Sequence, residues 1–175
     1  MTPPLSVIIP TLNEERALPA TLRRLRSALP DAEIIVADGG SRDDTTTLAR
    51  QSGARAVASP PGRGHQCRAG AAAARGAWLL FLHADTLLPP DADPVIATFA
   101  RTSSRPIATF RLRFDTGSVF LRACAWFSRF DTVFTRFGDQ GILVARALYD
   151  ALGGIPDWPL MEDVEFLRRA RRRIG

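Results

Sequence analysis

Short apolar runs alternate with helix-like segments through the first half of the chain. The run at residues 5–10 is followed by leucines at 18, 22, 25 and 29, and the run at 33–38 by a helix predicted through Leu48 to Gly53. A weaker run at 54–58 precedes an alanine-rich helix predicted over 66–75, with residues 60–64 as a loop between them. Parallel neighbouring strands cannot be joined by tight turns and need a crossover, which is usually a helix. The alternation of strands and helices therefore predicts a mostly parallel, Rossmann-like α/β sheet flanked by helices.

The strongest apolar run begins at Trp78 and continues through Leu82, and it gives way within three positions to His83 and Asp85. This pattern indicates a strand that is buried on both faces and whose carboxyl end meets solvent. Open α/β sheets bind ligands at that end. A carboxylate there suits Mg²⁺ or Mn²⁺, although an acid after a buried strand can equally cap a helix or lie in a loop.

Beyond Pro90 the alternation loosens. We predict a helix near 95–101, an alternating strand over 110–114, an aromatic helix through 126–130, a strand over 141–144, and a final helix from 161–163 onward. A length of 175 residues with 46% hydrophobic residues suits one domain over 1–175 with a sizeable core. The arginine-rich end stops at a helix terminus, which leaves open that the natural chain extends beyond Gly175.

The formal charge of +5 permits anionic partners, but arginine and aromatic residues are not interleaved, so we expect no nucleic-acid binding. Cys67 and Cys124 are isolated, which favours a reducing compartment. We see no secretory signal and no apolar run near the roughly 20 residues of a membrane span. A cytoplasmic protein is therefore expected. The aromatic face over 119–130 is interpreted as core, with peripheral contact at the inner face of a membrane as the alternative.

Three predicted strands end in polar groups: residues 10–14, Asp38 with the turn 39–41, and 83–85. In a parallel sheet these ends lie on one edge, so the groups converge there. Asp43 and Asp44 are expected to cap the second helix. Arg63 and Gln66 either meet a phosphate group from their loop or have no ligand role.

These motifs, in this order and spacing, resemble those of family-2 glycosyltransferases with the GT-A fold. The chain is most similar to a small bacterial branch associated with arsenosugar biosynthesis and selenodomain proteins. The resemblance runs from about residue 6 to residue 172, and it rests on the set of motifs because no single one is specific.

The resemblance implies a role for each motif. The residues that it assigns to the base and ribose of a nucleotide are Pro10, Thr11, Asn13, Glu14 and Asp38. Asp38 is placed to accept the imide hydrogen of uracil, and Arg63 is implied near the diphosphate. Asp85 matches the last acid of the metal-binding Asp-x-Asp motif, in which His83 replaces the first acid and is a second candidate metal ligand. Asp163 matches the general base. The residues implied on the acceptor side are Gly153, Gly154, Asp139, Gln140 and Glu162.

The function expected is that of a hexosyltransferase-type glycosyltransferase: inverting transfer from a nucleotide-diphosphate sugar, in particular a UDP-sugar, to a hydroxyl of a small or lipid-linked acceptor, with Mn²⁺ or Mg²⁺. A sugar-phosphate nucleotidyltransferase is the nearest enzyme alternative, but it should carry a glycine-rich basic loop where residues 11–14 stand. The other alternative is a non-catalytic nucleotide-binding module, which is supported by the presence of His83 where the metal-binding motif usually has an acid. The sequence identifies neither the sugar nor the acceptor nor the oligomeric state.

Overall fold

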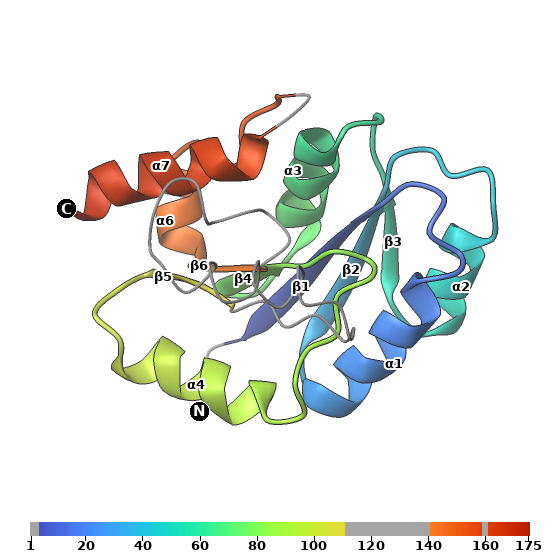
Figure 1. The fold of residues 1–175 in the computed structure, drawn as a ribbon, viewed down its shortest axis with the longest axis horizontal. Coiled ribbons are helices and arrows are strands. Elements are labelled where there is room, and N and C mark those ends of the chain that lie inside the picture. Colours follow the sequence, from blue (N-terminus) through green and yellow to red (C-terminus); the bar gives the residue numbers. More distant parts are fainter. Residues whose placement is uncertain (1–3, 111–140, 159–160) are drawn as a thin grey trace, which may run out of the picture.

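The computed structural model describes residues 4–110, 141–158 and 161–175, which form a six-stranded sheet between two layers of helices (Figure 1). The strands are β1 Leu5–Thr11, β2 Glu33–Asp38, β3 Arg55–Ala58, β4 Trp78–Phe81, β5 Ile107–Thr109 and β6 Ile142–Ala145. The helices are α1 Leu18–Ala28, α2 Thr45–Gln51, α3 Arg63–Ala73, α4 Ala92–Thr102, α6 Arg146–Ala151 and α7 Glu162–Ile174.

The strand order is β3-β2-β1-β4-β6-β5, and β1 to β4 pair in parallel as the sequence predicts. β6 runs antiparallel to β4, and β5 runs antiparallel to β6. The chain leaves β1 toward β2 on one side and later returns to β4 on the other. The carboxyl ends of β1 and β4 therefore flank the switch point, where open α/β sheets bind ligands.

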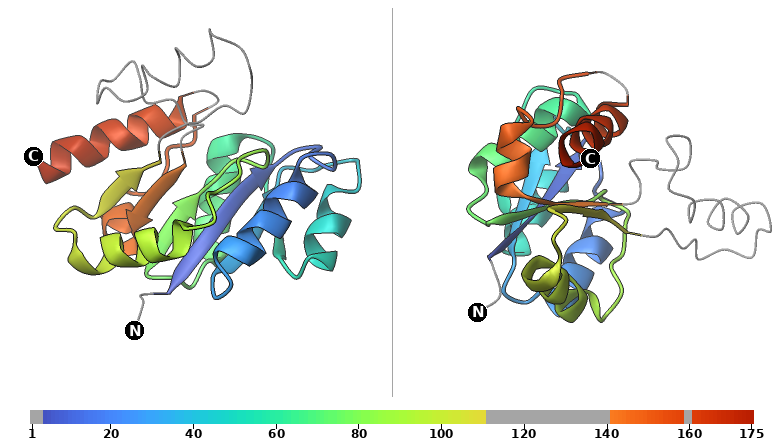
Figure 2. Two further views of the ribbon diagram at one scale, coloured as in Figure 1. Left: turned by 60° about the horizontal axis from the view of Figure 1, so that its bottom comes forward. Right: turned by 90° about the vertical axis from the view of Figure 1, so that its left-hand side faces the viewer.

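The central strands β1, β2, β4 and β6 are buried on both faces, whereas the edge strands β3 and β5 are partly exposed. Val7 and Ile9 of β1 pack into a cluster with α1 and α4, whereas Ile8 between them packs into a second cluster with α3, α6 and α7. The same alternation holds along β4 and β6. Figure 2 shows the two helical layers on opposite sides of the sheet. All four residues of β4 are buried, which confirms the prediction that the run from Trp78 is buried on both faces.

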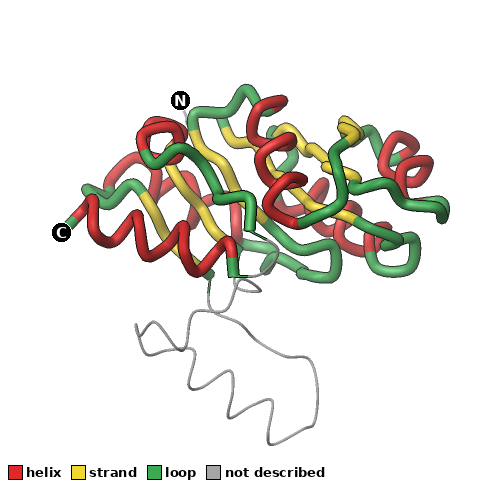
Figure 3. Tube along the Cα trace, turned by 90° about the horizontal axis from the view of Figure 1, so that it is seen from above, coloured by secondary structure: helices red, strands yellow, loops and turns green. Residues whose placement is uncertain are grey.

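Helix α3 lies unusually close to the sheet because small residues face it. A Cβ atom added at Gly70 would lie 2.4 Å from Cγ2 of Ile8 and 3.4 Å from Cβ of Ala37. Helix α7 runs from the middle of the molecule, near the strand ends, out to the carboxyl terminus (Figure 3). No helix in the described parts of the chain is long and apolar enough to cross a bilayer.

Several predictions need correction. Helix α3 begins at Arg63 rather than 66, since Gly62 adopts a positive φ of 124° and ends the loop early. The sequence did not predict α6, a helix of only six residues. Strand β5 covers 107–109, and the predicted strand residues 111–114 lie outside the described residues. The aromatic face 119–130 lies outside them too.

Candidate active site

The ends of β1 and β2 lie side by side, with Thr11 opposite Asp38 in the register. Asp38 closes the turn that follows it: its Oδ2 accepts hydrogen bonds from the backbone N–H groups of Gly40 (3.0 Å) and Ser41 (2.9 Å). Its Oδ1 accepts from the hydroxyl groups of Ser41 (2.5 Å) and Thr11 (3.2 Å). Burial opposes ionisation, but the hydrogen bonds from Ser41, Gly40 and Thr11 outweigh it and lower the pKa of Asp38.

Four hydrogen bonds use the whole accepting capacity of a carboxylate. A uracil imide hydrogen would therefore have to replace one of the donors that Asp38 has in this structure. The expected contact between Asp38 and the base thus requires a local rearrangement of Ser41 or Gly40 on binding.

The β1–α1 loop is tied to the turn after β2. Asn13 has a left-handed φ of 58°, and its backbone N–H donates to the Ser41 hydroxyl at 2.8 Å. The side-chain oxygen of Asn13 accepts from the N–H of Arg42 at 2.8 Å, and the N–H of Glu14 donates to the Thr45 hydroxyl at 2.8 Å. These bonds join the two loops that the sequence assigns to nucleotide binding. Pro10, the last predicted member of that group, lines the small cavity described below.

The two acids before α2 differ in role. Asp43 accepts from the backbone N–H of Thr45 at 3.0 Å and caps the helix as predicted. Asp44 occupies the N-cap position but forms no side-chain capping bond, so that prediction is wrong for Asp44.

Arg63 joins three predicted site residues from two distant segments. At the first turn of α3, its Nε donates to Oε1 of Glu162, and its Nη2 lies 3.0 Å from Oδ2 of Asp163. Its Nη1 lies 3.1 Å from Nε2 of His83, which must accept the bond because a guanidinium group only donates. Burial opposes the charge on Arg63, but Glu162 and Asp163 outweigh it and raise its pKa. The sequence did not predict this cluster. The only feature that could have indicated it is the opposite charge of Arg63 and the acids at 162 and 163.

One oxygen of Asp163 accepts a hydrogen bond, whereas the other is ion-paired with Arg63 and accepts no hydrogen bond. The residue is buried, and its Oδ1 accepts a hydrogen bond from the N–H of Val164 at 2.7 Å. Oδ2 has the charge of Arg63 nearby, but it has no hydrogen bond of good geometry. The N-cap of α7 is Met161, at a left-handed φ of 62°, so Asp163 is not the capping residue of this helix. Oδ2 is therefore a buried acceptor available to a hydroxyl hydrogen.

A small cavity of about 20 Å³ lies against this acid. A space of this size holds about one water molecule or one hydroxyl group. Its lining residues come from β1, α3, the end of β4, β6, the turn after α6 and the first turn of α7: Pro10, Arg63, Cys67, Phe81, Leu82, His83, Ile142, Ile155, Glu162 and Asp163. Burial raises the pKa of the Cys67 thiol to about 12, so this residue stays protonated and is not a thiolate nucleophile.

The acids near Asp85 favour a cation. Burial raises the pKa of Glu14, as do the carboxylates of Asp85 and Asp43, and His83 opposes them in part. Asp85 itself is exposed at the carboxyl end of β4. Among the described residues no three His, Cys, Asp or Glu side chains gather closely enough to hold a metal ion. A cation here would need other oxygen ligands, such as phosphate groups, and a metal at Nε2 of His83 would have to displace Arg63.

The predicted acceptor-side turn lies against α3. Gly153 and Gly154 both have positive φ, 74° and 77°, after α6. Nη1 of Arg68 donates to the carbonyl groups of Gly153 (3.1 Å) and Ile155 (3.3 Å). Arg68 was not predicted to have a role. Of the other acceptor-side residues, Glu162 lies in the Arg63 cluster, whereas Asp139 and Gln140 lie outside the described residues.

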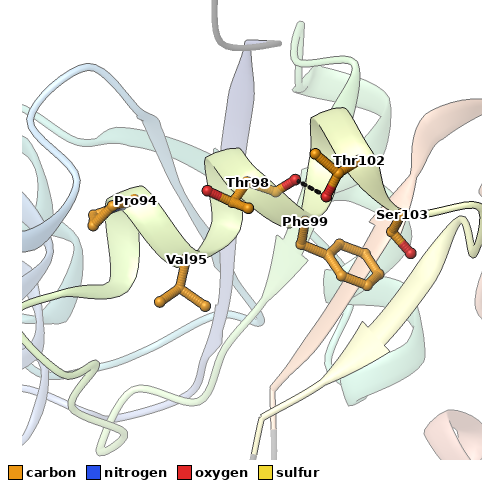
Figure 4. Close-up of a pocket in the computed structure, with 6 residues that line it drawn as sticks. All are labelled: Pro94, Val95, Thr98, Phe99, Thr102 and Ser103. Atoms are coloured by element: carbon orange, nitrogen blue, oxygen red, sulfur yellow. Dashed lines mark hydrogen bonds between the residues drawn. The ribbon is translucent and has the colours of Figure 1, made fainter.

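A second, more open pocket of about 530 Å³ lies on α4 (Figure 4). Its lining residues are Pro94, Val95, Thr98, Phe99, Thr102 and Ser103. Thr102 donates a hydrogen bond to the carbonyl of Thr98 at 2.9 Å, and the Phe99 ring packs edge-on against Trp78 with centroids 5.8 Å apart. No predicted site residue lines this pocket.

The sequence matches one family model, described as glycosyl transferase family 2, over residues 6–144. An uncharacterised glycosyltransferase of Mycobacterium bovis is 40% identical over 82 residues, which cover 46% of this chain and 36% of the relative. The undecaprenyl-phosphate 4-deoxy-4-formamido-L-arabinose transferase of Pseudomonas savastanoi pv. phaseolicola is 31% identical over 119 residues. The match covers 61% of this chain and 35% of that relative. The chain thus spans little more than a third of the length of these relatives.

Solved structures share the fold. Glucosyl-3-phosphoglycerate synthase from Mycobacterium tuberculosis, in complex with phosphoglyceric acid, aligns with a TM-score of 0.75 and 23% identity over 99% of this chain and 67% of the other. A structure of the same protein with Mn²⁺, UDP and glucosyl-3-phosphoglycerate gives a TM-score of 0.74 at 23% identity, with the same coverage. At this identity the likeness establishes the architecture of the sheet and helices.

Proposed function

Because this chain belongs to glycosyl transferase family 2, we propose that it transfers a sugar from a nucleotide-diphosphate sugar, a UDP-sugar in particular, to an acceptor hydroxyl. The observation that carries the proposal is Asp163, which has a buried Oδ2 without a hydrogen bond and lines a cavity of hydroxyl size together with Arg63. A buried carboxylate of this kind is suited to general-base catalysis.

The proposed reaction is a single displacement. The acceptor oxygen attacks the anomeric carbon while its proton passes to Oδ2 of Asp163. The bond from the anomeric carbon to the diphosphate oxygen breaks with its electron pair, and the nucleoside diphosphate leaves. One such displacement inverts the anomeric configuration. Arg63 keeps the base oriented, and its positive charge also makes it a partner for the leaving diphosphate.

The donor site includes the joined loops around Thr11, Asn13, Glu14 and Asp38. Asp85 and the donor phosphates would together hold Mn²⁺ or Mg²⁺, with His83 as a further ligand only where Arg63 moves away. When bound, the cation neutralises charge on the departing diphosphate. The solved neighbour that contains Mn²⁺ and UDP supports this choice of donor and metal.

The acceptor is expected beside Gly153 and Gly154, with Glu162, Asp139 and Gln140 on the same side. A small-molecule acceptor has support from the neighbour bound to phosphoglyceric acid, and a lipid-linked acceptor from the relative named for undecaprenyl phosphate. We further place the chain in the branch associated with arsenosugar biosynthesis and selenodomain proteins. The proposed location is the cytoplasm, with peripheral membrane contact if the acceptor is lipid-linked.

The test is a thermal-shift panel of UDP, GDP, CDP and dTDP, each with and without Mn²⁺. A ligand that binds only the folded state at 100 times its dissociation constant stabilises it by about 2.7 kcal/mol, so a specific site gives a clear shift. UDP with Mn²⁺ should give the largest one. No shift with any nucleotide would refute the donor assignment. Binding of UDP without turnover of any UDP-sugar, even to water, would favour a non-catalytic nucleotide-binding module.

A further inference from the structure

Gln66 links the helical layer to the ends of two strands. It lies on α3 and is 4% exposed, although glutamine is normally a surface residue. Its Nε2 donates to the backbone carbonyl of Thr11, the last residue of β1, and lies 3.4 Å from the carbonyl of Ala37 in β2. Both partners only accept, which fixes the orientation of the amide. The side chain therefore spans the carboxyl ends of neighbouring strands.

The backbone around Gln66 leaves room for this amide. A Cβ atom added at Gly39 would lie 2.9 Å from Nε2 of Gln66 and 3.3 Å from Cα of Pro61, so a side chain at position 39 would compete with Gln66 for the same space. The N–H of Gly39 also donates to the Thr11 carbonyl at 2.9 Å. Gln66 thus adds a second donor to the carbonyl at which the β1–β2 ladder ends.

The position of Gln66 is set by packing. The close approach of Gly70 to Ile8, one turn farther along α3, holds the helix against β1. Cys67 is buried in the same hydrophobic cluster as Ile8, so the face of α3 that carries Cys67 is turned toward the sheet. The Gln66 amide is consequently directed at the strand ends rather than at a phosphate group, which had been one interpretation of the sequence.

We propose that Gln66 is a positioning residue of the donor site: by bridging the ends of β1 and β2, it sets the distance between Thr11 and the Asp38 turn that bind the nucleoside. The inference rests on the proposed function, because it assigns Gln66 to the same nucleotide site. The Thr11 carbonyl keeps the Gly39 N–H when Gln66 is replaced. The strand pairing should therefore survive, while the spacing that the nucleoside needs is relaxed.

The test compares UDP affinity, measured by isothermal titration calorimetry with Mn²⁺, and thermal stability. Gln66→Met keeps the side-chain length and removes the donor, and it should weaken UDP binding about tenfold, the scale of one lost hydrogen bond. Arg68→Met is the matched control, since Arg68 also joins α3 to two carbonyl groups but in the 153–155 turn. It should leave UDP affinity within about twofold of wild type.

A second variant, Gln66→Asn, keeps the amide but is one methylene too short to reach Thr11, so it should also weaken UDP binding. In turnover of a UDP-sugar, the loss should fall on the donor KM rather than on kcat. UDP affinity equal to wild type in both Gln66 variants would overturn the inference and leave the proposed function standing. Equal losses in Arg68→Met would also overturn it, by showing a general loosening of α3. Failure of the wild type itself to bind UDP would overturn both proposals.

Discussion

Arg63 holds two buried carboxylates, and its removal should be costly. The side chains of Glu162 and Asp163 are 3% and 10% exposed, whereas that of Arg63 is 35% exposed. Removing one partner of a fully buried ion pair costs about 3–5 kcal/mol, since the other charge stays in a poorly solvated site. Because Arg63 is partly hydrated, we place Arg63→Met near the lower limit, at about 3 kcal/mol. A chain of this size loses roughly 2–4 °C per kcal/mol, so Tm should fall by about 6–12 °C.

The assay is urea unfolding followed by circular dichroism, at low and high salt, because salt screens a partly buried ion pair less than it screens a pair on the surface. The matched variant is the triple replacement Arg63→Met with Glu162→Gln and Asp163→Asn, which removes all three charges and should recover at least half of the loss. A cost below about 1 kcal/mol for Arg63→Met, the scale of a surface pair, would refute the reasoning. A triple variant no more stable than the single one would refute it as well.

Three further outcomes are expected. Asp163→Asn should lower transfer turnover about 10²-fold or more, the scale of lost general-base assistance, while UDP affinity by calorimetry stays within about twofold; normal turnover in the folded variant would remove Asp163 from the mechanism. Asp85→Asn should abolish the enhancement of UDP binding by Mn²⁺ without changing the circular dichroism spectrum, and a retained enhancement would place the cation elsewhere. Gly70→Ala puts a methyl group 2.4 Å from Cγ2 of Ile8, so overpacking of about 1–3 kcal/mol should exceed the gain in helix propensity of about 1 kcal/mol. A Tm equal to or above that of the wild type would show that α3 can move away from β1.

The centre of the sheet was predictable from sequence because the parallel strands β1, β2 and β4 are buried on both faces. Such strands are nearly continuous apolar runs, and the predicted run at 33–38 coincides with β2, Glu33–Asp38. The start of α3 was not predictable in the same way. Gly62, Arg63 and Gly64 have the composition of a loop, but a Cβ atom at Gly64 would lie 2.5 Å from the carbonyl oxygen of Pro156. The close packing of α3 against the segment at Pro156, which requires a glycine at position 64, involves residues far apart in the sequence and could not be predicted from local composition.

The candidate site, like the fold, could be predicted from the sequence only in part. Convergence of Asp38 and Asp85 at one sheet edge follows from topology alone, once the strands are known to be parallel. Arg63 and Glu162 are 99 positions apart, and no periodicity connects them. Asp38 was identified by its place at a strand end, but its four internal hydrogen bonds depend on the fold of the turn around Ser41.

Helix α3 carries four side chains that each join it to a different part of the molecule. Arg63 contacts the start of α7, His65 pairs with Asp157 at 2.9 Å, Gln66 bonds to the ends of β1 and β2, and Arg68 bonds to the 153–155 turn. Inserting or deleting one residue within the first two turns would rotate the following residues by about 100° about the helix axis. Several of these connections would then be lost in a single event. Length variation among natural relatives should therefore be absent between Gly62 and Arg68, and it should be tolerated in exposed loops at the amino ends of the strands, such as residues 30–31.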